Sequence, residues 1–323
     1  MPSLKEIKGR IASVNSTRKI TSAMKMVASS KLHHAQVAIQ NMLPYEELLE
    51  HILKSFLAAE AEAQTIYDQV RPVKRAALVV FTSNSSLCGG FNANTIRMML
   101  NAVNEYDKTI GRDNVEIYPI GRKVYEKANK MGLKVQGEFS ALADKPNVQQ
   151  CIEIAMELGK KFADGEIDKV ELIYHHFKSA GSQVLTRKTF LPIDLESELQ
   201  ADHERDLTSV IATKESQEYL KKRGERETSH EQEEVKPLND NFIVEPDMDT
   251  VLSQLIPKLA HLSLYTALLD SNASEHAARM VAMQTATDNA DELLRELNLQ
   301  YNKSRQQAIT NELLDIVGGS VNN

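Results

Sequence analysis

The C-terminal part of this chain reads as one very long helix. Residues 251–317 contain no glycine and a single proline, Pro257. At about 1.5 Å of rise per residue, a continuous helix over this segment would measure roughly 100 Å. A compact domain made from 323 residues cannot enclose a helix of that length. The segment therefore predicts an elongated helical structure that needs a partner for its apolar side.

Apolar residues recur along this segment at the steps of three and four that are typical of a coiled-coil seam. The seam consists of Leu255, Leu259, Leu262, Leu269, Ala273, Ala277, Met280, Ala290, Leu294, Leu297 and Tyr301. Its middle is rich in alanine, which has the highest intrinsic helix propensity and lets two helix backbones approach closely. The sequence predicts a thin and stiff helix pair.

The N-terminal residues show the same spacing with an interruption. The apolar seam comprises Leu4, Ile7, Ile11 and Val14, and then Ala28, Leu32, Ala35, Ile39 and Met42. Between these runs the seam positions are Arg18, Thr21 and Lys25, while Ile20, Met24 and Val27 fall one position away. We interpret this polar stretch as facing something other than the coiled-coil partner. A local stutter without function is the alternative.

The middle of the chain alternates between strand-like and helix-like segments. Strands are predicted at 76–83, 115–121, 169–179 and 183–192, and helices at 93–106, 122–131 and 148–162. The last two strands are predicted to form a hairpin through Ala180, Gly181 and Ser182. Alternating strands and helices favour a small Rossmann-like α/β domain with a mostly parallel sheet.

A glycine-containing turn, NSSLCGGFN at 84–92, follows the first predicted strand. A strand, a glycine turn and a helix N-terminus together can bind phosphate. The turn matches neither of the two common phosphate-binding glycine motifs. We therefore favour a tight turn with positive φ at Gly89 or Gly90, with nucleotide binding as the alternative. Cys88 is interpreted as a small packed residue, because no histidine or acid is spaced to activate it.

No metal site and no cofactor are predicted. The pairs His33-His34 and His175-His176 consist of adjacent residues, which point apart on a helix and on a strand. The two cysteines, Cys88 and Cys151, have no paired spacing, so neither a zinc site nor a disulfide framework is expected.

Charge is distributed unevenly along the chain. Residues 1–40 hold seven Lys and Arg against one acid, and residues 195–240 hold thirteen acids against seven bases. A basic helical arm commonly binds acidic protein or nucleic acid, and a solvated face is the alternative. The charged stretch 196–245 has few apolar residues and is predicted to be a mobile insertion. There is no apolar run of transmembrane length and no signal-peptide pattern, so membrane association is expected only through partners.

Four stretches of the sequence resemble the gamma subunit of F-type ATP synthases. They are TRKITSAMKMVASSKL at 17–32, SSLCGGFN at 85–92, the segment 275–307 and ITNELLDIVGGS at 309–320. The family's C-terminal signature usually ends in Gly-Ala, whereas this chain has Gly319 and Ser320. The resemblance covers about residues 1–195 and 240–320.

The resemblance implies a fold and a function. The helices at 1–60 and 246–320 would wind as a long antiparallel coiled coil, with the α/β domain at 70–195. The chain would be the non-catalytic central stalk that couples proton flow to ATP synthesis or hydrolysis by rotation inside a ring of alpha and beta subunits. Its other partners would be the epsilon subunit and the membrane c-ring, at the cytoplasmic face of a bacterial inner membrane.

The resemblance also implies partner-contact and coupling residues. Met24 and Lys25 lie where the family's shaft faces an acidic loop of a beta subunit, and Arg18 belongs to the same polar stretch. The full predicted set is Arg18, Met24, Lys25, Arg279, Met283, Arg305, Gln306, Thr310 and Glu312.

The residues leave two other functions as alternatives. A small-molecule enzyme would need an acid–base or nucleophile set in the α/β domain, and no such spacing is present. A basic coiled-coil protein that binds nucleic acid or acts as a scaffold is the second alternative. Residues 1–40 lack the aromatic side chains that stack on bases, so nucleic acid is not expected as a partner.

Overall fold

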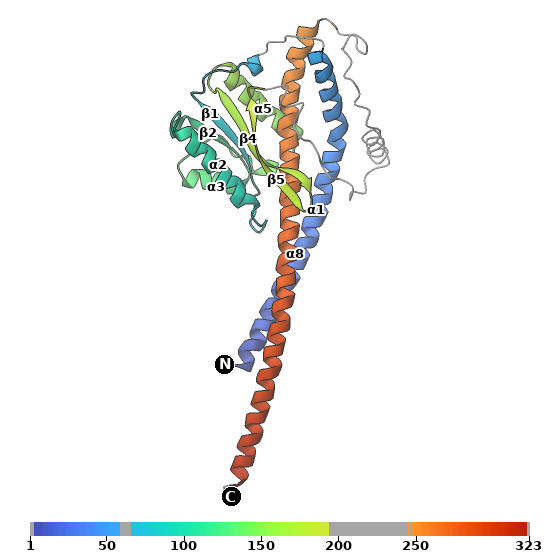
Figure 1. Ribbon diagram of the computed structural model, residues 1–323, viewed down its shortest axis with the longest axis vertical. Helices are drawn as coiled ribbons and strands as arrows, with labels where there is room; N and C mark the ends of the chain where they lie inside the picture. Colours follow the sequence, from blue (N-terminus) through green and yellow to red (C-terminus); the bar gives the residue numbers. More distant parts are fainter. Residues whose placement is uncertain (1–2, 59–65, 194–244, 246, 322–323) are drawn as a thin grey trace. The chain divides into compact units, whose positions relative to one another are not determined.

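The computed structural model describes residues 3–58, 66–193, 245 and 247–321 (Figure 1). Its elements in chain order are α1 (Leu4–Ala58), η1 (Ile66–Asp68), β1 (Ala76–Phe81), α2 (Phe91–Asp107), η2 (Arg112–Asn114), β2 (Val115–Ile120), α3 (Arg122–Lys130), β3 (Lys134–Val135), α4 (Ser140–Asp144), α5 (Val148–Ala163), β4 (Lys169–Ser179), β5 (Ser182–Leu191) and α8 (Met248–Val321). The chain divides into two compact units, one formed by residues 1–30 and 279–323 and the other by residues 31–278.

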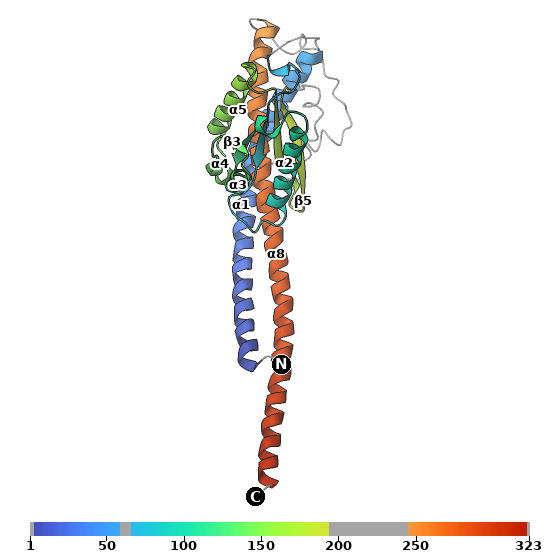
Figure 2. The same ribbon diagram turned by 90° about the vertical axis from the view of Figure 1, so that its left-hand side faces the viewer.

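The first unit pairs the beginning of α1 with the C-terminal part of α8, side by side in both Figure 1 and Figure 2. Two cross-helix contacts, Arg18 to Asp291 and Thr21 to Thr287, fix the direction of the pairing. Residue numbers rise along α1 while those of their partners fall along α8, so the helices are antiparallel. The seam side chains Ile7, Ala28, Met283, Ala290 and Leu297 are buried.

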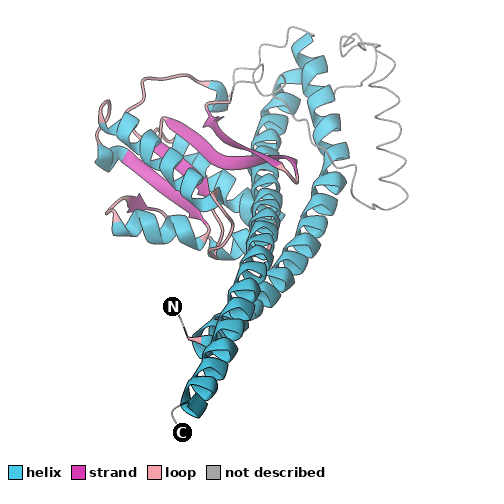
Figure 3. Cartoon of the chain, turned by 60° about the horizontal axis from the view of Figure 1, so that its bottom comes forward, coloured by secondary structure: helices cyan, strands magenta, loops and turns pink. Residues whose placement is uncertain are grey.

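The second unit contains a five-stranded sheet with the strand order β3-β2-β1-β4-β5. The pairs β1–β2, β1–β4 and β2–β3 are parallel, and β4–β5 is an antiparallel hairpin. Figure 3 distinguishes these strands from the helices that pack on them. The sheet continues outward from β1 in both directions, which is the doubly wound order of a Rossmann-like half.

Alternation along the strands divides the core of the second unit into two clusters. Ala76, Leu78 and Val80 of β1 pack with residues of α2 and α3. Ala77, Val79 and Phe81 point the other way and join a cluster with residues of α5, α1 and α8. Because both faces of β1 are covered, its side chains are all buried, as expected of a central parallel strand. The helix α8 therefore belongs to the core of this unit along its N-terminal part.

The predicted α/β class, the mostly parallel sheet and the two long helices are confirmed. The four predicted strands, the three predicted helices of the middle and the hairpin also form. Sequence inspection missed the short elements β3 and α4. The division into segments 1–60, 70–195, 196–245 and 246–320 stays a prediction, because each compact unit combines parts of both long helices. The predicted insertion lies outside the described residues except for Glu245.

Candidate functional site

A polar layer interrupts the apolar seam of the helix pair. The Oγ1 atoms of Thr21 and Thr287 are 2.8 Å apart, and Arg18 Nη1 donates to Asp291 Oδ1 at 2.9 Å. Thr21 is 8% exposed, whereas the Arg18 and Asp291 side chains are 40% and 43% exposed. The layer thus has a hydroxyl pair inside the seam and an ion pair at its border. We call these four residues the polar layer.

Each of the two hydroxyls in the polar layer has two acceptors within reach but only one proton to donate. Thr21 Oγ1 lies 3.0 Å from the Arg18 carbonyl oxygen, and Thr287 Oγ1 lies 2.8 Å from the Met283 carbonyl oxygen. Each hydroxyl has a single proton, so one of them donates across the pair while the other donates to its own helix. Both oxygen atoms are then satisfied within the seam.

The polar layer corrects one sequence interpretation. Arg18 and Thr21 do not turn away from the partner helix, because both contact α8. The sequence of the second helix also indicated a polar position in the seam. Met283 and Thr287 continue the steps of three and four from Met280 to Ala290, and so place a second threonine on the seam.

The apolar residues beside the polar layer face outward. Ile20, Met26 and Val27 are 60%, 69% and 59% exposed. Met24 and Lys25, two of the predicted contact residues, are half-buried. Over these turns α1 therefore presents apolar side chains to its surroundings while polar ones fill its seam.

The C-terminal end of α8 extends past the first residue of α1 (Figures 1 and 2). When the register of the polar layer is continued, Leu4 lies opposite the region of Ser304 and Arg305. Beyond this point the apolar side chains of Ile309, Leu313 and Leu314 are exposed.

The remaining predicted contact residues fall into two groups. Arg305, Gln306, Thr310 and Glu312 are exposed on the C-terminal end of α8. The Thr310 hydroxyl donates to the Gln306 carbonyl at 2.9 Å. Arg279 and Met283 are buried instead.

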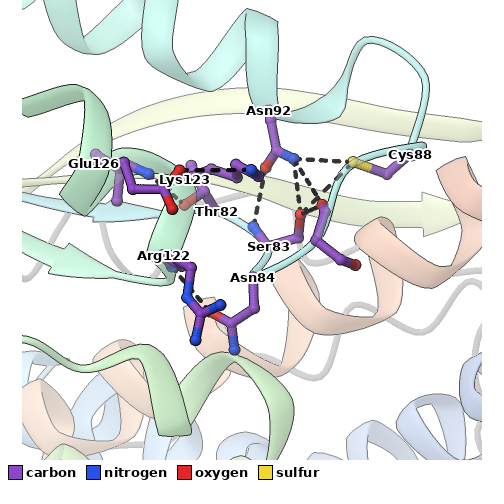
Figure 4. A network of polar contacts seen from close by, with 10 residues as sticks. Thr82, Ser83, Asn84, Cys88, Asn92, Arg122, Lys123 and Glu126 are labelled. Carbon is purple, nitrogen blue, oxygen red and sulfur yellow. Dashed lines mark hydrogen bonds and ion pairs between the residues drawn. The ribbon is translucent and has the colours of Figure 1, made fainter.

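The turn after β1 is closed by its own polar groups (Figure 4). The Asn92 side chain accepts from the Ser83 N–H at 3.0 Å and donates to Ser83 Oγ at 2.7 Å and Cys88 Sγ at 3.1 Å. Asn84 Oδ1 accepts from the backbone N–H of Arg122, the first residue of α3, at 2.8 Å. Gly89 has φ +58°, so the predicted positive φ at this turn is confirmed.

The helix α8 covers the carboxyl ends of β1 and β2, next to this turn. A cavity lined by Phe81, Thr82, Ile120, Ala143 and by Leu268, Ser271, Asn272 and Glu275 of α8 has room for about one water molecule. Nucleotides bind doubly wound sheets in the crevice at the carboxyl ends of the strands. Here the turn's polar groups are engaged internally and α8 lies over that end, so the geometry favours the structural interpretation of the turn.

His175 and His176 point to opposite faces of β4. His175 stacks on Phe91 with ring centroids 4.4 Å apart, and its Nδ1 lies 3.3 Å from Thr95 Oγ1. Burial lowers the pKa of His175 to about 4, so the ring is neutral at pH 7. His176 Nδ1 instead lies 2.6 Å from Asp270 Oδ2 of α8. The two imidazoles serve packing on different faces and do not converge.

Within the described part of the chain, no group of three or more His, Cys, Asp and Glu residues is placed to hold a metal ion. The described helices also include none whose length and apolar character would suffice to cross a membrane.

Comparison with known proteins places these features in a family. The family model described as ATP synthase matches residues 3–321. The ATP synthase gamma chain of Phocaeicola vulgatus is 54% identical over 321 residues, covering 99% of this chain and 100% of the relative. That of Bacteroides thetaiotaomicron is 52% identical over 323 residues, with 99% and 100% covered.

Solved structures share the fold at lower identity. The rotor of the Euglena gracilis mitochondrial ATP synthase superposes with a TM-score of 0.59 at 18% identity, covering 95% of this chain and 98% of that one. A central stalk and c-ring structure from Tetrahymena thermophila mitochondrial ATP synthase gives 0.51 at 24% identity, with 83% and 99% covered.

Proposed function

Because this chain belongs to the family of ATP synthase gamma chains, we propose that it is the non-catalytic central-stalk subunit of a rotary ATP synthase. The observation that carries the proposal is the full-length match to gamma chains, which extends over both long helices and the sheet between them. The subunit would couple proton flow through the membrane sector to ATP synthesis or hydrolysis by turning.

The geometry of the helix pair supports a mechanical role. An antiparallel pair has each helix braced by the other, and the buried alanines Ala28 and Ala290 keep the two backbones close. The engaged turn after β1 and the small cavity beside it favour a structural α/β unit over a nucleotide site. These features suit a part that transmits force.

The proposed partners follow from the family. They are the alpha and beta subunits as a surrounding ring, the epsilon subunit and the membrane c-ring, with no nucleic acid. The relatives in solved structures are described as a rotor and as a central stalk with its c-ring. The subunit would be peripheral, at the cytoplasmic face of a bacterial inner membrane, and held there through its partners.

We propose that two regions of this chain contact the ring of alpha and beta subunits. The first is the outward face of α1 around Met24 and Lys25, where exposed apolar residues lie among lysines. The second is the exposed end of α8 with Arg305, Gln306, Thr310 and Glu312. Rim ion pairs contribute only about 0–1 kcal/mol each, which suits contacts that must be made and released in turn. Arg18 would act at the border of the helix pair through its ion pair with Asp291, and the buried Arg279 and Met283 would act by keeping the shape of the stalk.

Co-purification tests the proposed function. The tagged full-length chain is expressed together with the alpha and beta ATPase subunits of a close relative, and the purified material is assayed for ATP hydrolysis. The proposal predicts a stable complex with alpha and beta subunits. Recovery of nucleic acid, or of the chain without these subunits, would favour the scaffold or nucleic-acid alternative.

A further inference from the structure

One short stretch of α8 makes three polar contacts with the sheet side of its unit. Asp270 Oδ2 lies 2.6 Å from His176 Nδ1 of β4. Asn272 Nδ2 donates to the Ala143 carbonyl of α4 at 2.8 Å, and Ser274 Oγ donates to the His175 carbonyl of β4 at 3.2 Å. All three lie within residues 270–274, in the second compact unit.

The contacts of Asp270 and Ser274 are shielded from solvent, whereas Asn272 is half-buried. Asp270 is 1% exposed, Ser274 is 0% exposed and the His176 side chain is 14% exposed. A hydrogen bond that includes a buried carboxylate is shorter and stronger than one between neutral groups in water. The Asp270 contact therefore holds α8 more firmly than an exposed polar contact would.

The three contacts add direction to an interface that also buries many apolar side chains. The neighbouring residues Leu264, Ala267, Leu268, Ala273 and Ala277 are buried. Apolar burial is not directional, so it resists separation more than it resists sliding or turning of a helix about its axis. Hydrogen bonds weaken steeply when their angles change. Contacts to β4 and to α4 from one helix segment thus fix both its axial position and its rotation.

We propose that Asp270, Asn272 and Ser274 form the joint through which torque passes between the α/β sheet and the shaft helix α8. The inference rests on the proposed function, since torque arises only if the subunit turns. The helix α8 runs without a break from Met248 to Val321, so a rotation imposed on residues 270–274 is carried along the same helix toward the ring-contact region. The three residues are positioning residues, because none of them would touch a nucleotide or an ion in transit.

The test uses the complete ATP synthase complex in sealed vesicles. The variants are Asp270→Asn, which keeps the size of the side chain and removes its charge, and Ser274→Ala, which removes one donor. Matched controls are Asp288→Asn and Ser253→Ala on the same helix. Asp288 and Ser253 are exposed, and their contacts here are with Gln284 and Thr250 of their own helix.

Two quantities are compared in each complex. One is ATP hydrolysis in the presence of an uncoupler, when the rotor turns without load. The other is the largest proton gradient that ATP hydrolysis can build. We expect hydrolysis without load to stay at the wild-type rate, and the limiting gradient to fall in Asp270→Asn, in Ser274→Ala and most in the double variant. The controls should keep the wild-type gradient.

The outcomes separate the joint from the proposed function. If Ser274→Ala and Asp270→Asn both reach the same limiting proton gradient as wild type, the proposed joint is wrong. A wild-type complex that hydrolyses ATP but never pumps would instead overturn the proposed function. If Asp270→Asn does not assemble, Ser274→Ala decides alone, and a lower gradient together with faster hydrogen exchange of the amides in 262–278 supports the joint.

Discussion

Thr21 of α1 and Thr287 of α8 share a hydrogen bond of 2.8 Å inside the seam of the helix pair. Apolar seams tolerate alternative registers, whereas a buried polar pair is satisfied in only one. A shift of α8 by one heptad would place Met280 or Leu294 opposite Thr21. Arg18 would then face Gln284 or Asn298 instead of Asp291. The polar layer therefore specifies the register of the pair.

The first prediction concerns that register. Replacing both threonines, as Thr21→Val and Thr287→Val, should increase the population of heptad-shifted pairs because valine keeps the volume and removes the hydroxyl. Register is measured by disulfide formation in full-length chains. The pair Val14→Cys with Leu294→Cys reports the native register, and Val14→Cys with Tyr301→Cys reports the shifted one.

Matched controls exist on the same two helices. Thr17 and Thr285 are exposed and donate to carbonyls of their own helix, so Thr17→Val with Thr285→Val should leave the cross-linking pattern unchanged. An unchanged pattern in the Thr21→Val, Thr287→Val chain as well would show that the apolar seam alone sets the register.

The second prediction concerns the ion pair of the polar layer. Arg18 and Asp291 are both more than a third exposed, so their pairing should stabilise the chain by only about 0–1 kcal/mol and less at high salt. A double-mutant cycle with Arg18→Gln and Asp291→Asn, read from urea unfolding, measures the coupling free energy. A coupling well above 1 kcal/mol that persists in 1 M salt would contradict the assignment of a weak border contact.

The third prediction concerns acid stability. His175 has a pKa of about 4 in the folded chain against 6.5 for an ordinary histidine, so the unfolded chain takes up its proton first as the pH falls. The free energy of unfolding should therefore decrease between about pH 6.5 and 4, by at most about 3 kcal/mol from this group. His175→Gln keeps a hydrogen-bonding group toward Thr95 and does not titrate, so its stability should depend less on pH across this window.

Chemical unfolding at several pH values tests this expectation. The change at an exposed histidine, His33→Gln, serves as the matched control. Identical pH dependence in wild type and His175→Gln would show that the buried ring contributes nothing to acid unfolding.

The fourth prediction concerns the close approach of β1 and the turn after β2. Gly121 has φ +110°, and a Cβ there would lie 2.0 Å from the Thr82 carbonyl oxygen. Gly121→Ala should destabilise the chain by about 3 kcal/mol or more, because both the backbone angle and the contact forbid it. Gly132 has φ +66° with open space around it, so Gly132→Ala should cost only about 1 kcal/mol. Thermal unfolding compares the two, and equal losses would exclude the steric contribution of Thr82.

Much of the fold could be predicted because its strands and long helices show clear patterns in the local sequence. The buried strand Ala76–Phe81 is an apolar run bounded by polar residues, and the seam spacing of α8 persists over many turns. The short β3 was missed because Lys134 and Val135 form a strand only through pairing with β2, which is a tertiary effect.

The polar layer shows a different limit of sequence inspection. A charged residue at a seam position suggests an outward face when one helix is considered alone. Arg18 pairs with the other helix at the border of the seam because Asp291 lies opposite, and that pairing depends on a register that neither helix specifies by itself. The same holds for His176 and Asp270, which are 94 residues apart and meet only when α8 packs on β4.

Direct observation of rotation tests the central claim. The complex of this chain with alpha and beta subunits is fixed to a surface through the ring, and a bead is attached to an exposed residue of the α/β unit. If the chain is the rotating stalk, ATP should drive stepwise rotation of the bead in one direction, at a rate that follows the rate of hydrolysis. ATP hydrolysis by the same complexes with a bead that only fluctuates would contradict it.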